Sequence, residues 1–219
     1  MGHYAIALDL TGKVCLVVGG GQVAERKIRS LLECGACVRV VSPELTAGLG
    51  KVVESGMIDY RQGRYRISDL SGVFLVIGAT NCKKINQQVS EDCLARNLLV
   101  NIVDDPAHCN FYVPAVIKRG LLTIAVTTGG RSPLLARRIR DELELAYGPQ
   151  YGEFLDLISI ARKDIISKVT NSKEKRKMLE NLVCDEVMDL LKKDRLDLLK
   201  GRMFGVNHGS GTQPQDGSS

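Results

Sequence analysis

The chain of 219 residues has no tryptophan and four phenylalanines, and aromatic residues make up only 5% of it. It has no run of basic residues interleaved with aromatic ones, and its formal net charge of +5 is mild. A balance of this size allows an anionic ligand, whereas a nucleic-acid-binding surface gathers Lys and Arg with stacking aromatics. We therefore expect no nucleic-acid partner.

Long hydrophobic runs are also missing. The longest apolar runs have the length of a β-strand, and a helix that crosses a bilayer needs about 20 apolar residues. The first residues, Met1-Gly2-His3-Tyr4, lead into a segment with Asp9 and Lys13 rather than into the apolar core of a signal peptide. These absences predict a cytoplasmic protein with no membrane partner.

The seven cysteines follow neither a disulfide framework nor a zinc-site spacing. Cys34 and Cys37 form a C-x-x-C pair, but they lie where a helix is expected to end. A redox pair instead uses the dipole at a helix N-terminus to lower the thiol pKa. No second pair completes a zinc site. We interpret all seven as reduced thiols, most of them in the core, and expect no bound metal.

Three glycines follow a strand-like run near the start of the chain. Residues 14–18 are five consecutive apolar residues, and apolar residues recur at helical spacing after the glycines. Gly19-x-Gly21-x-x-Ala24 is the dinucleotide-binding fingerprint in its Ala-ending form. Gly19 allows the sharp turn, Gly21 lets the backbone approach a pyrophosphate, and Ala24 keeps the helix close to the strand. The alternative is an ordinary strand, turn and helix without a ligand.

Strands and helices alternate through the first half of the chain. Strands are expected at 38–41, 57–60, 73–78 and 98–103, and helices at 22–33, 45–55 and 84–97. This alternation predicts an α/β fold, a Rossmann-like doubly wound parallel sheet, over residues 1–113.

The pattern changes in the second half. Two β-type runs, 111–118 and 121–128, predict a hairpin, and Ser132-Pro133 opens a helix that reaches Tyr147. We expect a small helical domain over 148–203 and a disordered Gly/Ser-rich tail over 204–219. Residues 114–147 form a separate segment between the sheet and the helices.

The position that normally binds the adenosine ribose lies at the end of the second strand. Ser42 and Pro43 occupy it, and Glu44 follows. Glu44 can either reach the ribose or cap the next helix. No Arg is present to hold a 2′-phosphate, which favours NAD over NADP.

Two further strand ends carry polar side chains. Gly78-Ala79-Thr80-Asn81 follows the fourth strand, where Thr80 or Asn81 can bond a cofactor or simply form a turn. Asp104-Asp105-Pro106 ends the fifth strand, and its carboxylates can act as a general base, capture a metal or belong to a solvated turn. Nearby His108 is interpreted as a structural or surface residue.

A second glycine turn, Thr127–Pro133, precedes the helix of the second half. Its helix start and Arg131 suit a carboxylate or phosphate. The alternative is a tight turn into a packing helix, and the two are compatible.

The set of motifs resembles the precorrin-2 dehydrogenase/sirohydrochlorin ferrochelatase family, the dehydrogenase-chelatase part of siroheme synthase. The matching residues are Tyr4, Leu8-Asp9-Leu10, Gly12-Lys13, Leu16–Gly21, Val23-Ala24, Lys27, Val41, Pro43-Glu44, Ala79-Thr80, Asn86, Asn101, Val103-Asp104, Pro106, Phe111, Pro114, Arg119, Thr128-Gly129-Gly130, Ser132-Pro133 and Ala136-Arg137.

The resemblance implies an NAD-dependent oxidation of precorrin-2 to sirohydrochlorin, and some family members also insert Fe²⁺ into the product. It assigns the catalytic aspartate to Asp104 and cofactor contacts to Gln22-Val23 and Pro43-Glu44. It also implies a homodimer formed through residues 114–147. Thr128 stands where some siroheme synthases carry a serine, so phosphorylation there stays open.

Precorrin-2 carries several carboxylates, and the second glycine turn offers partners for them. We expect Thr128, Gly129, Gly130 and Arg131 to contact the substrate, together with Arg119 and Asp105. Two other functions stay open, a chelatase without the redox step and a non-catalytic NAD-sensing module.

Overall fold

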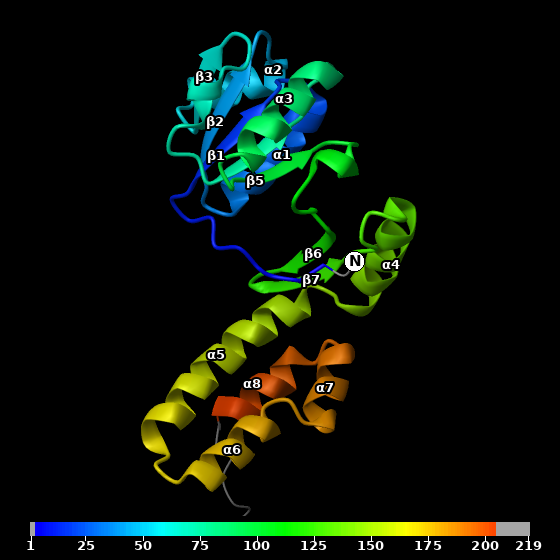
Figure 1. Cartoon of the computed structure of the whole chain (residues 1–219). Coiled ribbons are helices and arrows are strands. Elements are labelled where there is room, and N and C mark those ends of the chain that lie inside the picture. Colours follow the sequence, from blue (N-terminus) through cyan, green and yellow to red (C-terminus); the bar gives the residue numbers. More distant parts are fainter. Residues whose placement is uncertain (1–2, 205–219) are drawn as a thin grey trace, which may run out of the picture. The chain divides into compact units, whose positions relative to one another are not determined.

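The computed structural model describes residues 3–204. The chain divides after Val113 into two compact units, residues 1–113 and 114–219. Figure 1 shows both units, coloured along the sequence. Each unit is described by itself.

Unit 1 is a five-stranded parallel sheet with helices on both faces (Figure 1). Its strands are β1 Val14–Val18, β2 Cys37–Ser42, β3 Ile58–Gln62, β4 Leu75–Gly78 and β5 Leu99–Ile102. Its helices are α1 Gln22–Glu33, α2 Ala47–Glu54 and α3 Lys83–Leu94, with short 3₁₀ turns η1 Ile67–Leu70 and η2 Pro106–His108. The predicted Rossmann-like fold is confirmed.

The strand order is β3-β2-β1-β4-β5. Strands β2 and β3 are added on one side of β1, and β4 and β5 on the other, so the order reverses between β1 and β4. β1 pairs with β2 on one side and with β4 on the other, both in parallel. The carboxyl ends of β1 and β4 therefore lie side by side at the point where the strand order reverses. Doubly wound sheets bind their ligands at this point.

The two faces of the sheet bury different side chains. On one face, α1 and α2 pack with Ala24, Ile28 and Leu49 in a cluster that includes Val17 and Val40. On the other face, α3 contributes Val89 and Cys93 to a cluster with Leu16, Val76 and Val100. Because both faces are covered, the central strands are continuously apolar rather than alternating.

The open edge of β5 is closed by the segment that follows it. Asn110 Oδ1 accepts the backbone N–H of Val100 at 2.8 Å, and Cys109 Sγ accepts that of Ile102 at 3.1 Å. Side chains thus satisfy amides that would otherwise stay unpaired at a sheet edge. The same contacts fix the path of residues 104–110.

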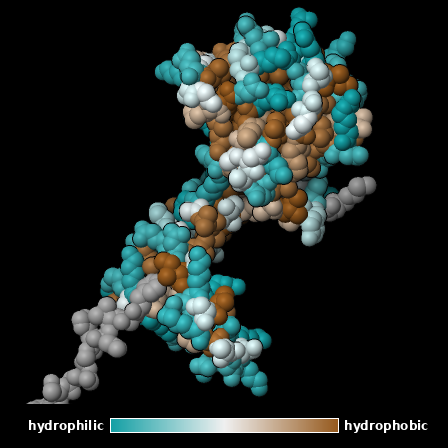
Figure 2. Space-filling model, turned by 90° about the vertical axis from the view of Figure 1, so that its left-hand side faces the viewer, coloured by the Kyte–Doolittle hydropathy of each residue, from teal (hydrophilic) through white to brown (hydrophobic). Residues whose placement is uncertain are grey.

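Unit 2 begins with a two-stranded antiparallel sheet, β6 Ala115–Arg119 and β7 Leu122–Val126. Helix α4 Pro133–Ala146 follows, and Ser132 caps it by accepting the N–H of Leu135. The remaining helices are α5 Gln150–Lys168, α6 Ser172–Asn181, α7 Asp185–Lys192 and α8 Leu196–Phe204. Apolar side chains are visible between hydrophilic ones on the surface of this helical part (Figure 2).

Helix α5 joins the two parts of unit 2. It contacts both strands of the hairpin as well as α6, α7 and α8. Its Tyr151 and Phe154 share a core with Val187, Leu191 and Leu199. The separation of 114–147 from 148–203 stays a prediction. The predicted tail lies outside the described residues except for Phe204, which ends α8.

Two loop segments of unit 1 contain short regular elements, and one expectation about the cysteines fails. Pro106 opens the 3₁₀ turn η2, because its fixed φ suits a helical first position. Residues 61–71 contain the end of β3 and all of η1. Of the seven cysteines, only Cys15 and Cys93 are buried, so the expectation that most of them lie in the core is wrong.

Within residues 3–204, no helix is long and apolar enough to cross a membrane.

Candidate functional site

In the glycine turn between β1 and α1, two glycines are packed too closely for a side chain, and the third has free space beside it. Gly19 has φ +126°, and a Cβ there would strike the carbonyl of Ala79. A Cβ on Gly20 would strike the carbonyl of Glu44 and lie 2.8 Å from Ser42 Oγ. A Cβ on Gly21 would meet no atom within 4 Å. Gly19 and Gly20 are therefore needed to bring the strand ends together, whereas Gly21 faces empty space.

The start of α1 is suited to an anion. Gly21 is its N-cap and supplies no side-chain acceptor, so the amides of Gln22, Val23 and Ala24 have no capping partner from it. These amides and the positive end of the helix dipole are the groups that hold a pyrophosphate in nucleotide-binding folds. The open space at Gly21 is where such a group can approach, and the residues present therefore fit a dinucleotide.

The turn after β2 leaves Pro43 and Glu44 exposed. Ser42 donates its hydroxyl hydrogen bond to the carbonyl of Glu44 at 2.7 Å, which fixes the backbone of this turn. The side chain that caps α2 is Thr46, which accepts the N–H of Leu49 at 3.2 Å. The alternative that Glu44 caps this helix is therefore wrong, and its carboxylate is left available at the carboxyl edge of the sheet.

Thr80, after β4, is held by the side chain of Asn86, a residue for which the sequence predicted no role. Asn86 is almost fully buried on α3, and its Oδ1 lies 2.7 Å from Thr80 Oγ1 while its Nδ2 donates to the carbonyl of Thr80 at 2.9 Å. The Thr80 hydroxyl is thus already engaged inside the protein. Thr80 shapes the turn beside Gly19 through these bonds, and its predicted contact with the cofactor stays a prediction.

Asp104, two residues after β5, has φ +58° and an exposed side chain. A positive φ is uncommon for a residue other than glycine, and Asp tolerates it better than most. Burial lowers the pKa of Lys27 on α1, Arg26 adds to this, and the carboxylate of Asp104 acts in the opposite direction. Asp104 therefore lies close enough to α1 to interact with the charge of Lys27.

The neighbouring residue, Asp105, pairs with His108. Its Oδ2 lies 2.8 Å from His108 Nδ1, and both side chains are about one third exposed, at 39% and 34%. The interpretation of His108 as an isolated structural or surface histidine did not foresee this pair. A histidine three residues after a carboxylate, across a proline that opens a helical turn, was the available signal.

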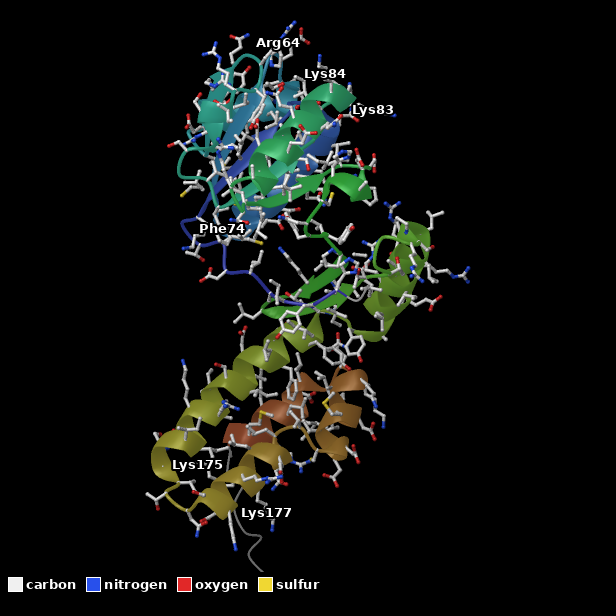
Figure 3. The ribbon with its side chains drawn as sticks, in the orientation of Figure 1. Arg64, Phe74, Lys83, Lys84, Lys175 and Lys177 are labelled. Carbon is white, nitrogen blue, oxygen red and sulfur yellow. The ribbon has the colours of Figure 1, made fainter. Side chains whose placement is uncertain are left out.

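Exposed cations lie along the same edge of unit 1. Arg64 follows β3, and Lys83 and Lys84 extend outward from the first turn of α3 (Figure 3). Lysines are unusual in the first turn of a helix because they oppose its dipole. They add positive potential to a sheet edge that already presents helix N-termini, which favours anionic ligands. None of these three residues belongs to a motif of the sequence, so no local pattern marks them as part of the site.

The second glycine turn is held by its threonines. Thr128 Oγ1 accepts the N–H of Ser132 at 3.1 Å and donates to the carbonyl of Ser132 at 3.0 Å. Gly129 and Gly130 have φ +62° and +79°, which other residues rarely adopt. Arg131 is exposed. The structure thus shows the tight turn into a packing helix, and it leaves the guanidinium of Arg131 accessible.

Arg119 is used inside unit 2. Its Nε donates to the carbonyl of Tyr147 at 2.9 Å, and its Nη2 lies 3.3 Å from both the carbonyl and the carboxylate of Glu144. These bonds satisfy carbonyls at the C-terminal end of α4, which a cation also stabilises through the helix dipole. Arg119 therefore clamps α4 to β6, and its contacts add no support to the predicted role in substrate binding.

Within unit 1, the predicted residues meet at one edge. Gly19–Ala24, Pro43-Glu44, Thr80 and Asp104-Asp105 follow the carboxyl ends of β1, β2, β4 and β5. Thr128–Arg131 and Arg119 belong to unit 2. Among residues 3–204, no three His, Cys, Asp or Glu side chains are placed to hold a metal ion together.

Comparison with known proteins gives two family matches. Residues 6–115 match the family described as "Putative NAD(P)-binding", and residues 119–145 match "Sirohaem biosynthesis protein central". The first covers half of the chain and contains the glycine turn and Asp104.

Curated relatives and a solved structure agree with these families. The siroheme synthase of Photorhabdus laumondii is 36% identical over 180 residues, which are 82% of this chain and 38% of that protein. The siroheme synthase of Saccharophagus degradans is 39% identical over 183 residues, 84% of this chain and 40% of that protein. The chain thus spans well under half the length of these relatives.

The solved structure of SirC, a precorrin-2 dehydrogenase, superposes with a TM-score of 0.75 at 29% identity. The superposition covers 90% of this chain and 99% of SirC. The match therefore extends over the sheet, the hairpin and helices. Together with the two family models, it shows that the chain belongs to the NAD(P)-binding family that includes precorrin-2 dehydrogenase and the corresponding part of siroheme synthase.

Proposed function

We propose that this protein oxidises precorrin-2 to sirohydrochlorin with NAD as the hydride acceptor. The observation that carries the proposal is the glycine turn, in which Gly19 and Gly20 are required by packing while Gly21 faces open space at a helix start. A turn built only for folding has no need of the third glycine. The likeness to SirC, named a precorrin-2 dehydrogenase, supports the choice of substrate.

Bound NAD would supply the site that accepts a hydride. The amides of Gln22, Val23 and Ala24 would bind its pyrophosphate, and Pro43-Glu44 would lie beside its adenosine ribose. The exposed carboxylate of Glu44 can accept hydrogen bonds from the ribose hydroxyls, and it would repel a 2′-phosphate. These features favour NAD over NADP.

Asp104 is our candidate for the catalytic base. Removal of two hydrogens from precorrin-2 releases one as a hydride with its electron pair and one as a proton, and the proton needs an acceptor. Asp104 is exposed at the end of β5, on the edge of unit 1 that carries the glycine turn. Its left-handed backbone conformation is of the kind that recurs at functional sites.

The carboxylates of the substrate need cationic or N–H partners. We propose that Arg131 and the turn Thr128–Gly130 supply some of them, because Arg131 is exposed and the turn opens α4. Asp105 would lie at the substrate edge beside Asp104.

The seven cysteines, all of them thiols, support a reducing compartment such as the cytoplasm.

We also propose a homodimer formed through unit 2. Leu121, Leu134 and Leu145 are 82%, 76% and 89% exposed around the hairpin and α4. Large exposed apolar side chains mark interaction sites when a partner covers them, and we propose that a second copy of unit 2 covers these leucines.

Insertion of Fe²⁺ into sirohydrochlorin is the second candidate activity. Metal insertion displaces two protons from the macrocycle, and the end of β5 carries two separate groups that can take a proton, Asp104 and the Asp105–His108 pair. Fe²⁺ would be a substrate here.

The test is anaerobic incubation of the protein with precorrin-2 and NAD, followed by measurement of the NADH absorbance. The proposal predicts NADH formation in step with sirohydrochlorin. A chelatase-only protein or an NAD-sensing module would form no NADH, and adding Fe²⁺ or Co²⁺ to sirohydrochlorin then separates those two.

A further inference from the structure

The loop after β5 is built to hold one imidazole in place. Ser90, which is fully buried on α3, donates its hydroxyl hydrogen bond to the carbonyl of His108 at 2.9 Å. The 3₁₀ turn Pro106–His108 brings the ring of His108 back over Asp105. Cys109, the next residue, is tied to the backbone of β5 through Ile102. The backbone of His108 and of the next residue is therefore held in place, and the ring of His108 is paired with Asp105.

The pair with Asp105 decides which ring nitrogen is available. A carboxylate 2.8 Å from Nδ1 accepts a hydrogen bond from that nitrogen and so favours the tautomer with its proton on Nδ1. Nε2 then carries the lone pair. Many enzymes use a carboxylate to orient a histidine base in this way. A histidine retained only for packing needs no such orientation.

The position of the pair matches a reaction that releases protons. Asp105 and His108 follow β5 at the edge where Gly19–Gly21 and Asp104 lie, and the ring of His108 and the carboxylate of Asp105 both reach solvent. Asp104 lies near Lys27 of α1, on one face of the sheet, whereas Ser90 of α3 holds His108 from the other. Two proton-accepting groups thus flank the end of one strand.

We propose that His108, oriented by Asp105, is a second proton-accepting residue of this site, with Nε2 taking a proton that the tetrapyrrole releases. The inference rests on the proposed function. In the oxidation, the hydride and its two electrons pass to NAD, Asp104 takes the one remaining proton, and Nε2 of His108 accepts that proton in turn before it passes to water. Iron insertion releases two protons, one for each of two bases.

The first test is independent of turnover. Nitrogen-15 NMR of the full chain, labelled in its three histidines, reports which ring nitrogen of neutral His108 carries the proton. We expect the Nδ1–H form in the wild type and a shift toward the Nε2–H form in Asp105→Ala. An Nε2–H form in the wild type overturns the proposal.

The second test is chemical rescue. His108→Ala should lower kcat for precorrin-2 oxidation about 100-fold, the lower end of what a proton-transfer group contributes. Added imidazole should recover about tenfold of this, with the Kd for NAD within about twofold of wild type. His3→Ala, which removes the other histidine among residues 3–204, is the control. Its kcat should equal that of the wild type and should not change when imidazole is added.

Three outcomes decide between roles. Wild-type kcat in His108→Ala overturns the proposal, and so does a loss of activity that imidazole does not restore, because a structural defect gives that pattern. If the wild-type protein forms no NADH, the proposed function fails, and the NMR measurement still decides whether His108 is oriented as a base.

Discussion

The two units of this chain bury their strands to very different degrees. In unit 1, β4 is buried at every position and β1 at all but its first residue. In unit 2, only Ile117 of the hairpin β6–β7 is buried. Unit 1 leaves its most exposed apolar residues, Tyr4 and Ile6, in the segment before the sheet, whereas unit 2 exposes leucines on its hairpin and α4.

The difference shows what each unit lacks. A sheet covered by helices on both faces completes its own core, so the open feature of unit 1 is a polar edge that suits a ligand. A two-stranded hairpin is marginal alone and needs other elements to cover it. In unit 2, α4 and α5 cover part of the hairpin, and exposed leucines remain. The difference supports our proposals that unit 1 binds a small molecule at its polar edge and that unit 2 meets a second copy of the chain.

The largest expected effect is at the polar edge of unit 1. Asp104→Asn should lower kcat for precorrin-2 oxidation by about 100-fold or more, because the amide cannot accept the proton. Asn is a better choice than Ala since it tolerates the φ of +58° that Asp104 adopts. Calorimetric titration should find the Kd for NAD unchanged. A wild-type rate would remove Asp104 from the mechanism.

The next effect is at the exposed face of unit 2. Leu134→Glu combined with Leu145→Glu should raise the dimer dissociation constant about 100-fold, because two buried leucines contribute about 3 kcal/mol or more to association. Light scattering after gel filtration gives the mass of the particle. The melting temperature of the dissociated chain should change little, since these side chains are 76% and 89% exposed within the chain. If the doubly substituted chain remains a dimer, another face of the chain forms the dimer.

The affinity for NAD should respond to the third glycine in a way that separates binding from folding. Gly21→Val should raise the Kd for NAD about tenfold or more, because its side chain fills the space that a pyrophosphate needs. Gly21 has an extended φ of −83°, so Val fits the backbone, and the changed N-cap costs the fold about 1 kcal/mol or less.

Gly20→Ala is the matched control. Its Cβ would strike the Glu44 carbonyl, and overpacking of this kind costs about 1–3 kcal/mol of stability. Urea denaturation should therefore separate the two variants, with the larger loss of stability in Gly20→Ala. An unchanged Kd in Gly21→Val would show that the pyrophosphate lies elsewhere.

These variants also show what the sequence could and could not predict. The dinucleotide-binding fingerprint predicted roles for Gly19 and Gly21 because its residues lie close together in the sequence. Uninterrupted apolar runs predicted the buried strands for the same reason. The requirement at Gly20 comes from Glu44, Leu45 and Ser42 on the neighbouring strand end, a contact that only the packed sheet creates. Local spacing therefore predicts which elements form, and packing decides which of their residues are indispensable.

Side-chain partners were the least predictable part of the site. Arg119 was expected to bind an anion, but its guanidinium bonds the last turn of α4, which lies 28 residues further along the chain at Tyr147. Asn86 and Thr80 bond each other across a turn, and Asp105 orients His108. Such partners depend on where a long side chain ends after packing, and a pattern of residue types does not contain that information.

The smallest expected effect distinguishes the units by pH. Burial raises the pKa of Cys15 to about 11 and that of Cys93 to about 12, and both thiols lie in the core of unit 1. An unfolded thiol ionises near its ordinary pKa of about 8.5. Between these values the folded state keeps protons that the unfolded state releases, so the stability they support is complete below about pH 8.5 and falls as the pH rises toward 11.

The midpoint of urea denaturation, followed by circular dichroism, should therefore decrease as the pH rises from about 8, which is below the ordinary thiol pKa, to about 10.5, which is just below the pKa of Cys15. The variant Cys15→Ala/Cys93→Ala should show a flatter dependence, though with a lower midpoint at pH 8 because it leaves small cavities. Burial also raises the pKa of Tyr65, which hydrogen-bonds Asp92, so a residual slope should persist above about pH 10. If the midpoint of the variant depends on pH as steeply as that of the wild type, groups other than the two thiols cause the loss of stability at alkaline pH. The pH dependence would then not distinguish unit 1 from unit 2.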